Sequence, residues 1–273
     1  MHGILEDRYY RGRLAILRRM LFLGALHNVT VFLGVGHDIL SNVQDSIGGP
    51  VAKRARWCVI PNGIDTARVE VSDDSARRSM RMELGIDDSS LIYGFFGRFM
   101  PQKGFDLIIK AVKIISDSIR PGDRKPMIVA VGSGDFERET RSEVHDAGLS
   151  DFFRFLPFRA DIASLIAGCD AVLMPSRWEA FSLLAAECLC AGVPLIASNC
   201  LGLREVISGT PALAIPPEHV HALVEAMQKV GADPISIRKR ALHYRLKAVE
   251  RFDVRATASQ LMSLFHSVAK PDR

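Results

Sequence analysis

Short apolar runs alternate with longer helical stretches over most of the chain after residue 90. An apolar run of about four to eight residues, bounded by glycine, proline or polar residues, is typical of a buried strand, and the longer stretches between such runs are typical of helices. This alternation predicts an α/β fold with a doubly wound, Rossmann-like parallel sheet. The expected strands lie at 91–97, 126–131, 152–156, 170–174, 193–198 and 212–215, and the expected helices at 105–116, 136–147, 162–168, 183–191, 203–207 and 218–230.

The chain on either side of this region has a different pattern. Before residue 55 we expect a basic helix, a strand at 28–35 and a second helical stretch. A short strand that ends at Pro61-Asn62-Gly63 marks a domain boundary, because proline and Asn-Gly are strong turn signals. Residues 66–90 are polar and charged and are interpreted as a linker, and residues 235–269 are expected to be helical. We therefore divide the chain into residues 1–58, 59–235 and 236–273.

The composition supports a full globular core and a reducing environment. With 273 residues and 48% hydrophobic side chains, the chain is long enough for one large or two small domains. The formal net charge of +4 favours anionic ligands but is too small and too evenly spread to predict nucleic acid binding. The five cysteines lie in apolar segments, are odd in number and lack the C-x2-C spacing of zinc sites, which favours the cytoplasm.

The basic N-terminal helix leaves a membrane surface open as a partner. Glu6 and Asp7 precede the apolar run 20–26 and paired arginines interrupt it, a pattern typical of neither a signal peptide nor a membrane span. A basic helix can contact anionic lipid headgroups, although arginines on a solvated helix face are the commoner case. We expect a cytoplasmic protein, with peripheral contact at the inner face of the membrane as an option.

Two carboxylates frame the main candidate site. Glu179 lies on the loop after the strand at 170–174, and Glu187 lies eight residues later, inside the next helix. Ligands of open parallel sheets bind at the carboxyl ends of strands, where loops and helix N-termini converge. A simpler alternative is that Glu179 or Ser182 only caps the helix and that Glu187 is solvated. For Glu187 its small and apolar neighbours argue against that alternative, since they predict a partly buried carboxylate that needs a hydrogen-bond partner.

A second candidate site follows the first strand of the sheet. Gly97, Arg98, Lys103 and Gly104 precede the helix at 105–116, and two cations at a helix N-terminus form an anion site that suits a phosphate. The sequence contains neither a Walker motif nor G-x-G-x-x-G. A Gly-x-Gly turn follows the second strand, and such a turn is more often a plain tight turn than a phosphate cradle.

Five spaced motifs occur in order along the chain: Asn62-Gly63-Ile64-Asp65, Gly97-Arg98 with Lys103-Gly104, Gly132-Ser133-Gly134, Glu179 with Glu187, and Ala191-Gly192-Val193-Pro194. Together they resemble the motifs of the family-4 retaining glycosyltransferases over residues 59–230. The resemblance implies the GT-B architecture, in which two Rossmann-like domains face each other across a cleft and the second domain holds most of the nucleotide-sugar donor. It also implies transfer with retention, in which the leaving phosphate helps to deprotonate the acceptor.

The resemblance also implies roles for individual residues. Glu179 would be a catalytic residue that faces the donor sugar, and Arg98 and Lys103 would be catalytic cations that hold the donor diphosphate. Glu187 would bind the ribose hydroxyls. The further donor contacts that it implies are Gly97, Gly132, Phe158, Ala180, Phe181 and Ser182.

Some of these implied features stay open. Phe158 would lie in the base-contacting loop, but a strand end with a proline turn explains the same residues equally well. His2-Gly3 resembles a pair that lies near the donor sugar in the first domain of the family. No convincing D-x-D motif lies where a sugar donor would sit, so the two cations would replace a metal ion. Neither a metal nor a cofactor is expected.

One departure from the resemblance affects the function. Only 58 residues precede the predicted boundary, whereas an ordinary domain has about 150. We therefore expect residues 1–58 to be the remnant of a truncated acceptor-side domain, whose missing part is supplied by another chain or by a longer native product. A homo-oligomer is also an expected partner. The leading hypothesis is a glycosyltransferase with an unknown saccharide, lipid-linked or small-molecule acceptor. The alternative is a non-catalytic nucleotide-sugar binding module or an inactive remnant. A dinucleotide-dependent oxidoreductase is disfavoured because the fingerprint glycine loop is absent.

Overall fold

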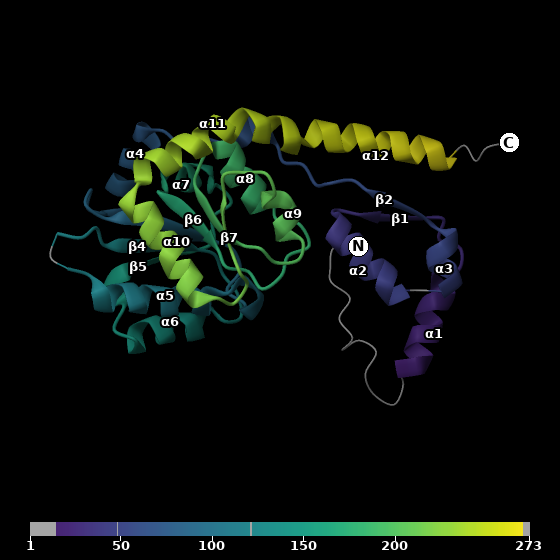
Figure 1. Cartoon of the computed structure of the whole chain (residues 1–273), viewed down its shortest axis with the longest axis horizontal. Coiled ribbons are helices and arrows are strands. Elements are labelled where there is room, and N and C mark those ends of the chain that lie inside the picture. Colours follow the sequence, from purple (N-terminus) through teal and green to yellow (C-terminus); the bar gives the residue numbers. More distant parts are fainter. Residues whose placement is uncertain (1–14, 48, 121, 270–273) are drawn as a thin grey trace.

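The computed structural model describes residues 15–47, 49–120 and 122–269. Its larger sheet has six parallel strands in the order β5-β4-β3-β6-β7-β8 (Figure 1). The strand order reverses between β3 and β6, so the carboxyl ends of these two strands form the crevice in which such sheets bind ligands. The predicted doubly wound parallel sheet is confirmed. Its strands are β3 (Leu91–Phe96), β4 (Pro126–Val131), β5 (Phe153–Leu156), β6 (Ala171–Met174), β7 (Leu195–Ser198) and β8 (Leu213–Ile215).

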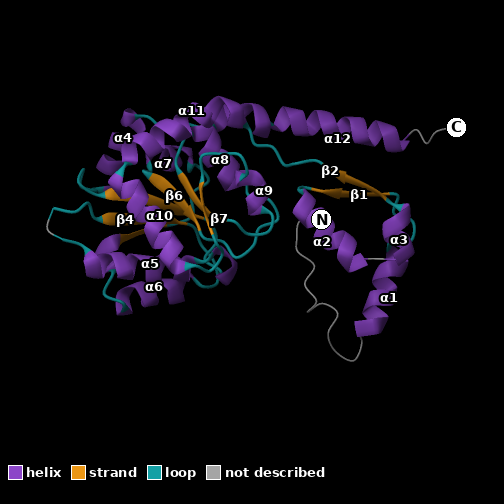
Figure 2. Cartoon of the chain, viewed as in Figure 1, coloured by secondary structure: helices purple, strands orange, loops and turns teal. Residues whose placement is uncertain are grey.

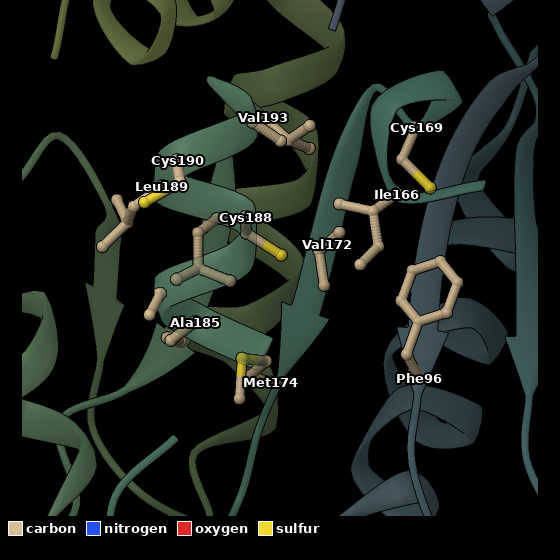
Figure 3. Close-up of a cluster of buried hydrophobic side chains, with 14 of the residues drawn as sticks. Phe96, Ile166, Cys169, Val172, Met174, Ala185, Cys188, Leu189, Cys190 and Val193 are labelled. Atoms are coloured by element: carbon tan, nitrogen blue, oxygen red, sulfur yellow. The ribbon is translucent and has the colours of Figure 1, made fainter. Parts of the chain in front are cut away.

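Helices cover both faces of this sheet, as Figure 2 shows. Their apolar faces form two separate cores with the side chains that alternate above and below the strands. Figure 3 shows part of one core, where Cys188 points toward Val172 of β6. The helices of that core are α4 (Asp74–Leu84), α7 (Ala163–Gly168), α8 (Leu183–Ala191), α9 (Leu203–Ile207) and α11 (Pro234–Phe252). The helices of the other core are α5 (Phe105–Ser118), α6 (Glu137–Asp146) and α10 (Val220–Ala232).

The N-terminal part of the described chain, residues 15–59, has a small sheet of its own and is called the N-terminal half below. Its two parallel strands are covered by helices, and Phe32 stacks on Trp57 across the strands with ring centroids 4.4 Å apart. Phe32, Leu40, Val43 and Ile47 make a core that is separate from those of the larger sheet. The elements of this half are α1 (Ala15–Ala25), β1 (Val31–Gly34), α2 (His37–Ile47), α3 (Gly49–Arg54) and β2 (Arg56–Val59).

The structure corrects the interpretation of residues 66–90 as a linker, because α4 lies within them. Its buried positions include an arginine, Arg81, next to Met80, so the helix lacks the apolar periodicity that would have predicted it. The Arg81 guanidinium lies 3.1 Å from the carboxylate of Asp170, which is buried just before β6. Arg77 of α4 also contacts Asp170, and the backbone N–H of Ile92 donates to it at 2.8 Å. Paired charges therefore fix α4 to the two central strands.

The C-terminal stretch is helical, as expected, and forms two helices. α11 ends at Phe252 and α12 (Val254–Ala269) begins after Asp253, which forms a β-bridge with Ile64. The chain connection between the two sheets passes so close to this junction that a Cβ on Gly63 would lie 2.4 Å from the Val254 Cα. Beyond the junction α12 runs alongside β2 (Figure 1), and Arg56 of β2 donates to Ser267 at 3.2 Å.

Across the described ranges, no helix combines the length and the apolar character needed to span a bilayer. The cytoplasmic location and the peripheral membrane contact stay predictions.

Candidate active site

Three loops meet at the carboxyl ends of β3, β4 and β6. The loop after β3 contains the short 3₁₀ helix η3 (Pro101–Lys103), and the loop after β6 leads into α8. These two loops touch at Gly104. Only glycine fits at this position, because φ is 68° and a Cβ would lie 2.2 Å from the Pro175 carbonyl oxygen. Gln102 joins the two loops through two hydrogen bonds. Its side-chain amide donates to the Trp178 carbonyl at 2.8 Å, and its backbone carbonyl accepts from Arg177 N at 2.8 Å. The two predicted sites therefore form one site.

The loop after β4 is packed against the loop after β3. Phe99 N donates to the Ser133 carbonyl at 3.0 Å, and a Cβ on Gly132 would lie 1.9 Å from the Gly97 carbonyl oxygen. The sequence analysis favoured a plain tight turn over a phosphate cradle here, and the observed requirement for glycine at position 132 comes from this backbone contact. A direct contact of Gly97 or Gly132 with a donor stays a prediction.

Lys103 and the buried Glu179 form an ion pair at the centre of this site. The Lys103 Nζ lies 2.7 Å from Glu179 Oε1, and the Ser176 hydroxyl donates to the same oxygen at 2.8 Å. Glu179 is only 5% exposed, and a carboxylate so buried needs hydrogen-bonding partners of this kind. Arg98 is exposed and forms no hydrogen bond or ion pair with any described residue. Its guanidinium is free to bind an anion.

Glu187 lies on the wall of a cavity of about 450 Å³ between α8, the start of α7 and the connection that follows Ile64. The side chain is half-buried, which confirms that part of the prediction. Desolvation raises the pKa of Glu187 above its ordinary value. The predicted hydrogen-bond partner is not found within the described ranges, so the carboxylate faces the cavity without compensation. A bound group with hydroxyl donors would supply the missing hydrogen bonds to Glu187.

The residues at the start of α8 have structural roles of their own. The Ser182 hydroxyl is the N-cap, since it accepts from Ala185 N at 3.2 Å, as the capping alternative stated. The Phe181 ring packs edge-on against Phe252, with centroids 6.4 Å apart. With these side chains engaged, Ala180, Phe181 and Ser182 have mainly backbone groups to offer a ligand, next to the first N–H groups of α8.

Two other predicted contacts are not decided by the geometry. Phe158 follows β5 and is 71% exposed, which fits both a base-contacting residue and a proline turn. Its role stays a prediction. His2 and Gly3 lie outside the described residues.

Arg177 is a site residue that the sequence analysis missed. Its guanidinium donates to both carboxylate oxygens of Asp106 at 3.0 Å, to Glu218 at 3.0 Å and to the Pro101 carbonyl. Burial opposes ionisation of Asp106, but the hydrogen bonds and charge of Arg177 lower the pKa of Asp106 below its ordinary value. Arg177 therefore fixes the turn that carries Lys103. No sequence signal pairs Arg177 with Asp106, because 71 residues separate them.

Comparison with known families identifies the chain. A family model described as glycosyl transferases group 1 matches residues 76–247, which include every element from β3 to α10. The chain belongs to the glycosyl transferases group 1. This agrees with the GT-B resemblance, whereas membership of family 4 and truncation of the first domain stay predictions.

Curated relatives of this glycosyltransferase chain are longer than the chain itself. It is 27% identical over 238 residues to the lipopolysaccharide core biosynthesis mannosyltransferase LpsB of Rhizobium meliloti (strain 1021), a match that covers 83% of this chain and 67% of LpsB. It is 30% identical over 231 residues to the D-inositol 3-phosphate glycosyltransferase of Corynebacterium glutamicum (strain R), which covers 82% of this chain and 54% of that protein. The matches thus span about half to two thirds of these relatives.

Solved structures show the same fold. Anabaena Alr3699/HepE in complex with UDP-glucose superimposes with a TM-score of 0.82 at 22% identity, over 98% of this chain and 71% of that chain. Sucrose-phosphate synthase from Thermosynechococcus elongatus superimposes with a TM-score of 0.79 at 23% identity, over 98% of this chain and 66% of that chain. At these identities the likeness establishes the GT-B type of fold.

Proposed function

We propose that this chain is the donor-binding half of a family-4 retaining glycosyltransferase, which transfers a sugar from a nucleoside diphosphate sugar to a saccharide, lipid-linked or small-molecule acceptor. The observation that carries the proposal is the Lys103–Glu179 ion pair at the strand ends, where the loop after β3 also carries the free cation Arg98. Glu187 of α8, the helix that follows the Glu179 loop, faces a cavity without a partner among the described residues. The names of the mannosyltransferase and inositol phosphate glycosyltransferase relatives, and the UDP-glucose complex of the similar Anabaena structure, support it.

The cations would act on the leaving group. During transfer the bond between the anomeric carbon and the diphosphate oxygen breaks, a bond to the acceptor oxygen forms, and the acceptor proton passes to the leaving phosphate. Negative charge therefore grows on the diphosphate, and Arg98 and Lys103 would stabilise it more strongly in the transition state than in the ground state. The first N–H groups of α8 would add to this stabilisation. In this proposal the two cations and the helix start would compensate the diphosphate without a metal ion.

The carboxylates would divide the rest of the donor between them. Glu179 is held by Lys103 and Ser176 after β6. In this proposal it would face the donor sugar. Glu187 faces the neighbouring cavity, where ribose hydroxyls would donate to it and offset its desolvation. The cavity has room for the ribose and base.

We expect Glu187→Gln to make the protein more stable at neutral pH and a weaker binder of nucleoside diphosphates. Desolvation raises the pKa of Glu187 in the folded state, so its ionised form costs stability at neutral pH, and glutamine removes this cost. Loss of a charge-assisted bond to ribose should reduce affinity about tenfold. Thermal unfolding and calorimetry measure the two effects.

Two controls accompany this experiment. The gain in stability should vanish below the ordinary pKa of glutamate, about 4.3, where Glu187 is protonated in both states. Glu179→Gln should leave diphosphate affinity nearly intact, because that residue is assigned to the sugar. Equal losses of diphosphate affinity in both variants would contradict the division of roles.

The test of the proposed function is calorimetry of the full chain with UDP, GDP and ADP, and then with UDP-glucose and GDP-mannose, in buffer that contains EDTA. Metal-independent binding of at least one nucleoside diphosphate and of its sugar conjugate is expected. Absence of binding by every compound, or binding that EDTA abolishes, would refute the proposal.

The alternative to a glycosyltransferase is a nucleotide-sugar binding module without turnover. The two are separated by incubating the bound sugar nucleotide with the chain and measuring release of the nucleoside diphosphate. Nuclear magnetic resonance of the sugar product then reports its anomeric configuration, and inversion would contradict a retaining mechanism.

A further inference from the structure

Reciprocal contacts join α2 of the N-terminal half to α9 of the part built on the larger sheet, which is called the main body below. α9 lies on the side of the main body that faces the N-terminal half (Figure 1). The Glu205 carboxylate of α9 accepts hydrogen bonds from the backbone N–H groups of His37, at 2.8 Å, and of Asp38. In return Asp38 accepts from Arg204 through Nε at 2.6 Å and through a second guanidinium nitrogen at 2.5 Å. Each element thus supplies a carboxylate to donors on the other.

The charges at this contact are well compensated. The Arg204 hydrogen bond is the main cause of a lowered pKa for Asp38, although burial opposes it. Glu205 lies at the N-terminal end of α2, where the helix dipole favours negative charge. Arg251 of α11 donates to the carbonyls of Glu205, at 2.7 Å, and Ser208, at 3.2 Å, so α9 is also fixed to the main body.

The same contact reaches the loop that carries Glu179. Gly202, two residues before Arg204, donates to Asp38 Oδ2 at 3.3 Å. It also packs directly under Glu179, because a Cβ at Gly202 would lie 2.1 Å from the Glu179 carbonyl oxygen. Glu179 N donates to the Leu201 carbonyl at 3.0 Å. A shift of the Glu179 loop must therefore move the residues that bind Asp38.

We propose that Arg204 and Glu205 are positioning residues that couple the donor-sugar loop to the N-terminal half. A sugar nucleotide that orders Glu179 would also order residues 201–205, which pack against the Glu179 loop. Through Asp38 and the start of α2, this ordering would fix the N-terminal half, the proposed acceptor side, against the donor-binding part. The inference rests on the proposed function, since it needs a ligand at Glu179. Neither Arg204 nor Glu205 has to touch that ligand.

Hydrogen exchange with mass analysis of the full chain tests the coupling. UDP-glucose and GDP-mannose are the probes, whichever binds in calorimetry, each compared with its nucleoside diphosphate. In the unsubstituted protein the sugar nucleotide should slow exchange in peptides covering 200–205 and in those covering the start of α2, by at least about fivefold. In Arg204→Ala and Asp38→Ala the slowing in α2 should be lost, while that at 200–205 and the nucleoside diphosphate affinity remain.

The comparison separates coupling from a merely structural contact. Loss of a structural contact raises exchange in α2 equally with and without ligand, whereas loss of coupling removes the ligand-dependent difference. Arg141→Ala is the matched control, because Arg141 forms a surface pair with Glu137 at 2.8 Å within α6, and it should preserve that difference. Ligand-dependent slowing that persists in α2 of both variants, or that is absent from α2 of the unsubstituted protein despite binding, would overturn the inference alone. Failure of every probe to bind would refute the proposed function.

Discussion

Replacing Arg98 and Lys103 together with alanine should weaken nucleoside diphosphate binding by roughly two to four powers of ten. Each cation would make a charge-assisted hydrogen bond to phosphate, worth about 1.5–3 kcal/mol, and each 1.4 kcal/mol is about tenfold in affinity. Arg98 has no partner in the described part of the protein, so its full interaction is available to the ligand. Calorimetry of the single and double variants with UDP or GDP gives the measurement.

Lys103 needs a separate check, because it also compensates the buried Glu179 at 2.7 Å. Lys103→Ala should lower thermal stability as well as affinity, since it leaves that carboxylate without a cation. Arg98→Ala should lower affinity alone. Lys113→Ala is the control for net charge, because Lys113 pairs with Asp117 on the exposed side of α5. Unchanged diphosphate affinity in the Arg98/Lys103 double variant would sink the phosphate assignment.

Asp170→Ala should destabilise the protein by about 3–5 kcal/mol without any direct effect on ligand contacts. The substitution removes the buried counter-ion of Arg81, which is 7% exposed and keeps only the exposed Asp88 at 3.9 Å, and also removes the acceptor of Ile92 N. The lost compensation of a buried charge outweighs the loss of the aspartate side chain itself. Chemical denaturation followed by the fluorescence of Trp57 and Trp178 measures the change.

The matched control is an ion pair between a cationic side chain and an aspartate on the protein surface. Asp117→Ala breaks the Lys113–Asp117 pair of 2.7 Å, whose side chains are 52% and 61% exposed, and should cost no more than about 0.5 kcal/mol. Asp170→Asn should fall between the two, because the amide oxygen can still accept from Ile92 N. A loss below about 1 kcal/mol for Asp170→Ala would show that the buried network does not hold α4.

The sheet could be predicted from the sequence because its strands are buried on both faces. Continuous apolar runs such as Pro126–Val131 have no other plausible structure between turn signals. The helix α4 could not be predicted in this way, since an arginine occupies a buried position and its acidic partner lies 89 residues away. The position of the break between the two C-terminal helices could not be predicted, because no glycine or proline marks it and Asp253 there forms a bridge with Ile64.

The site was predictable to the extent that it depends on strand ends. Lys103 and Glu179 follow β3 and β6, which the sheet makes neighbours, so their meeting follows from the topology. The contacts of Arg177 and Arg204 depend on side-chain geometry across loops and between halves, and nothing in their local sequence indicates a partner. The hydroxyl of Ser182 is used as a helix cap, a possibility that its position before α8 left open.

The path of the C-terminal chain has a consequence for dividing the polypeptide. α11 lies against the larger sheet, but α12 crosses to the smaller one, where Arg56 binds Ser267 and where Thr257 donates to the Pro61 carbonyl at 3.0 Å. The last helix thus belongs structurally to the N-terminal half, at the opposite end of the sequence. Cutting the chain between the two sheets yields two fragments that do not correspond to the two halves. A fragment that starts after Pro61 keeps α12 but lacks the small sheet that α12 packs against. A fragment that stops before Pro61 keeps the small sheet but lacks α12.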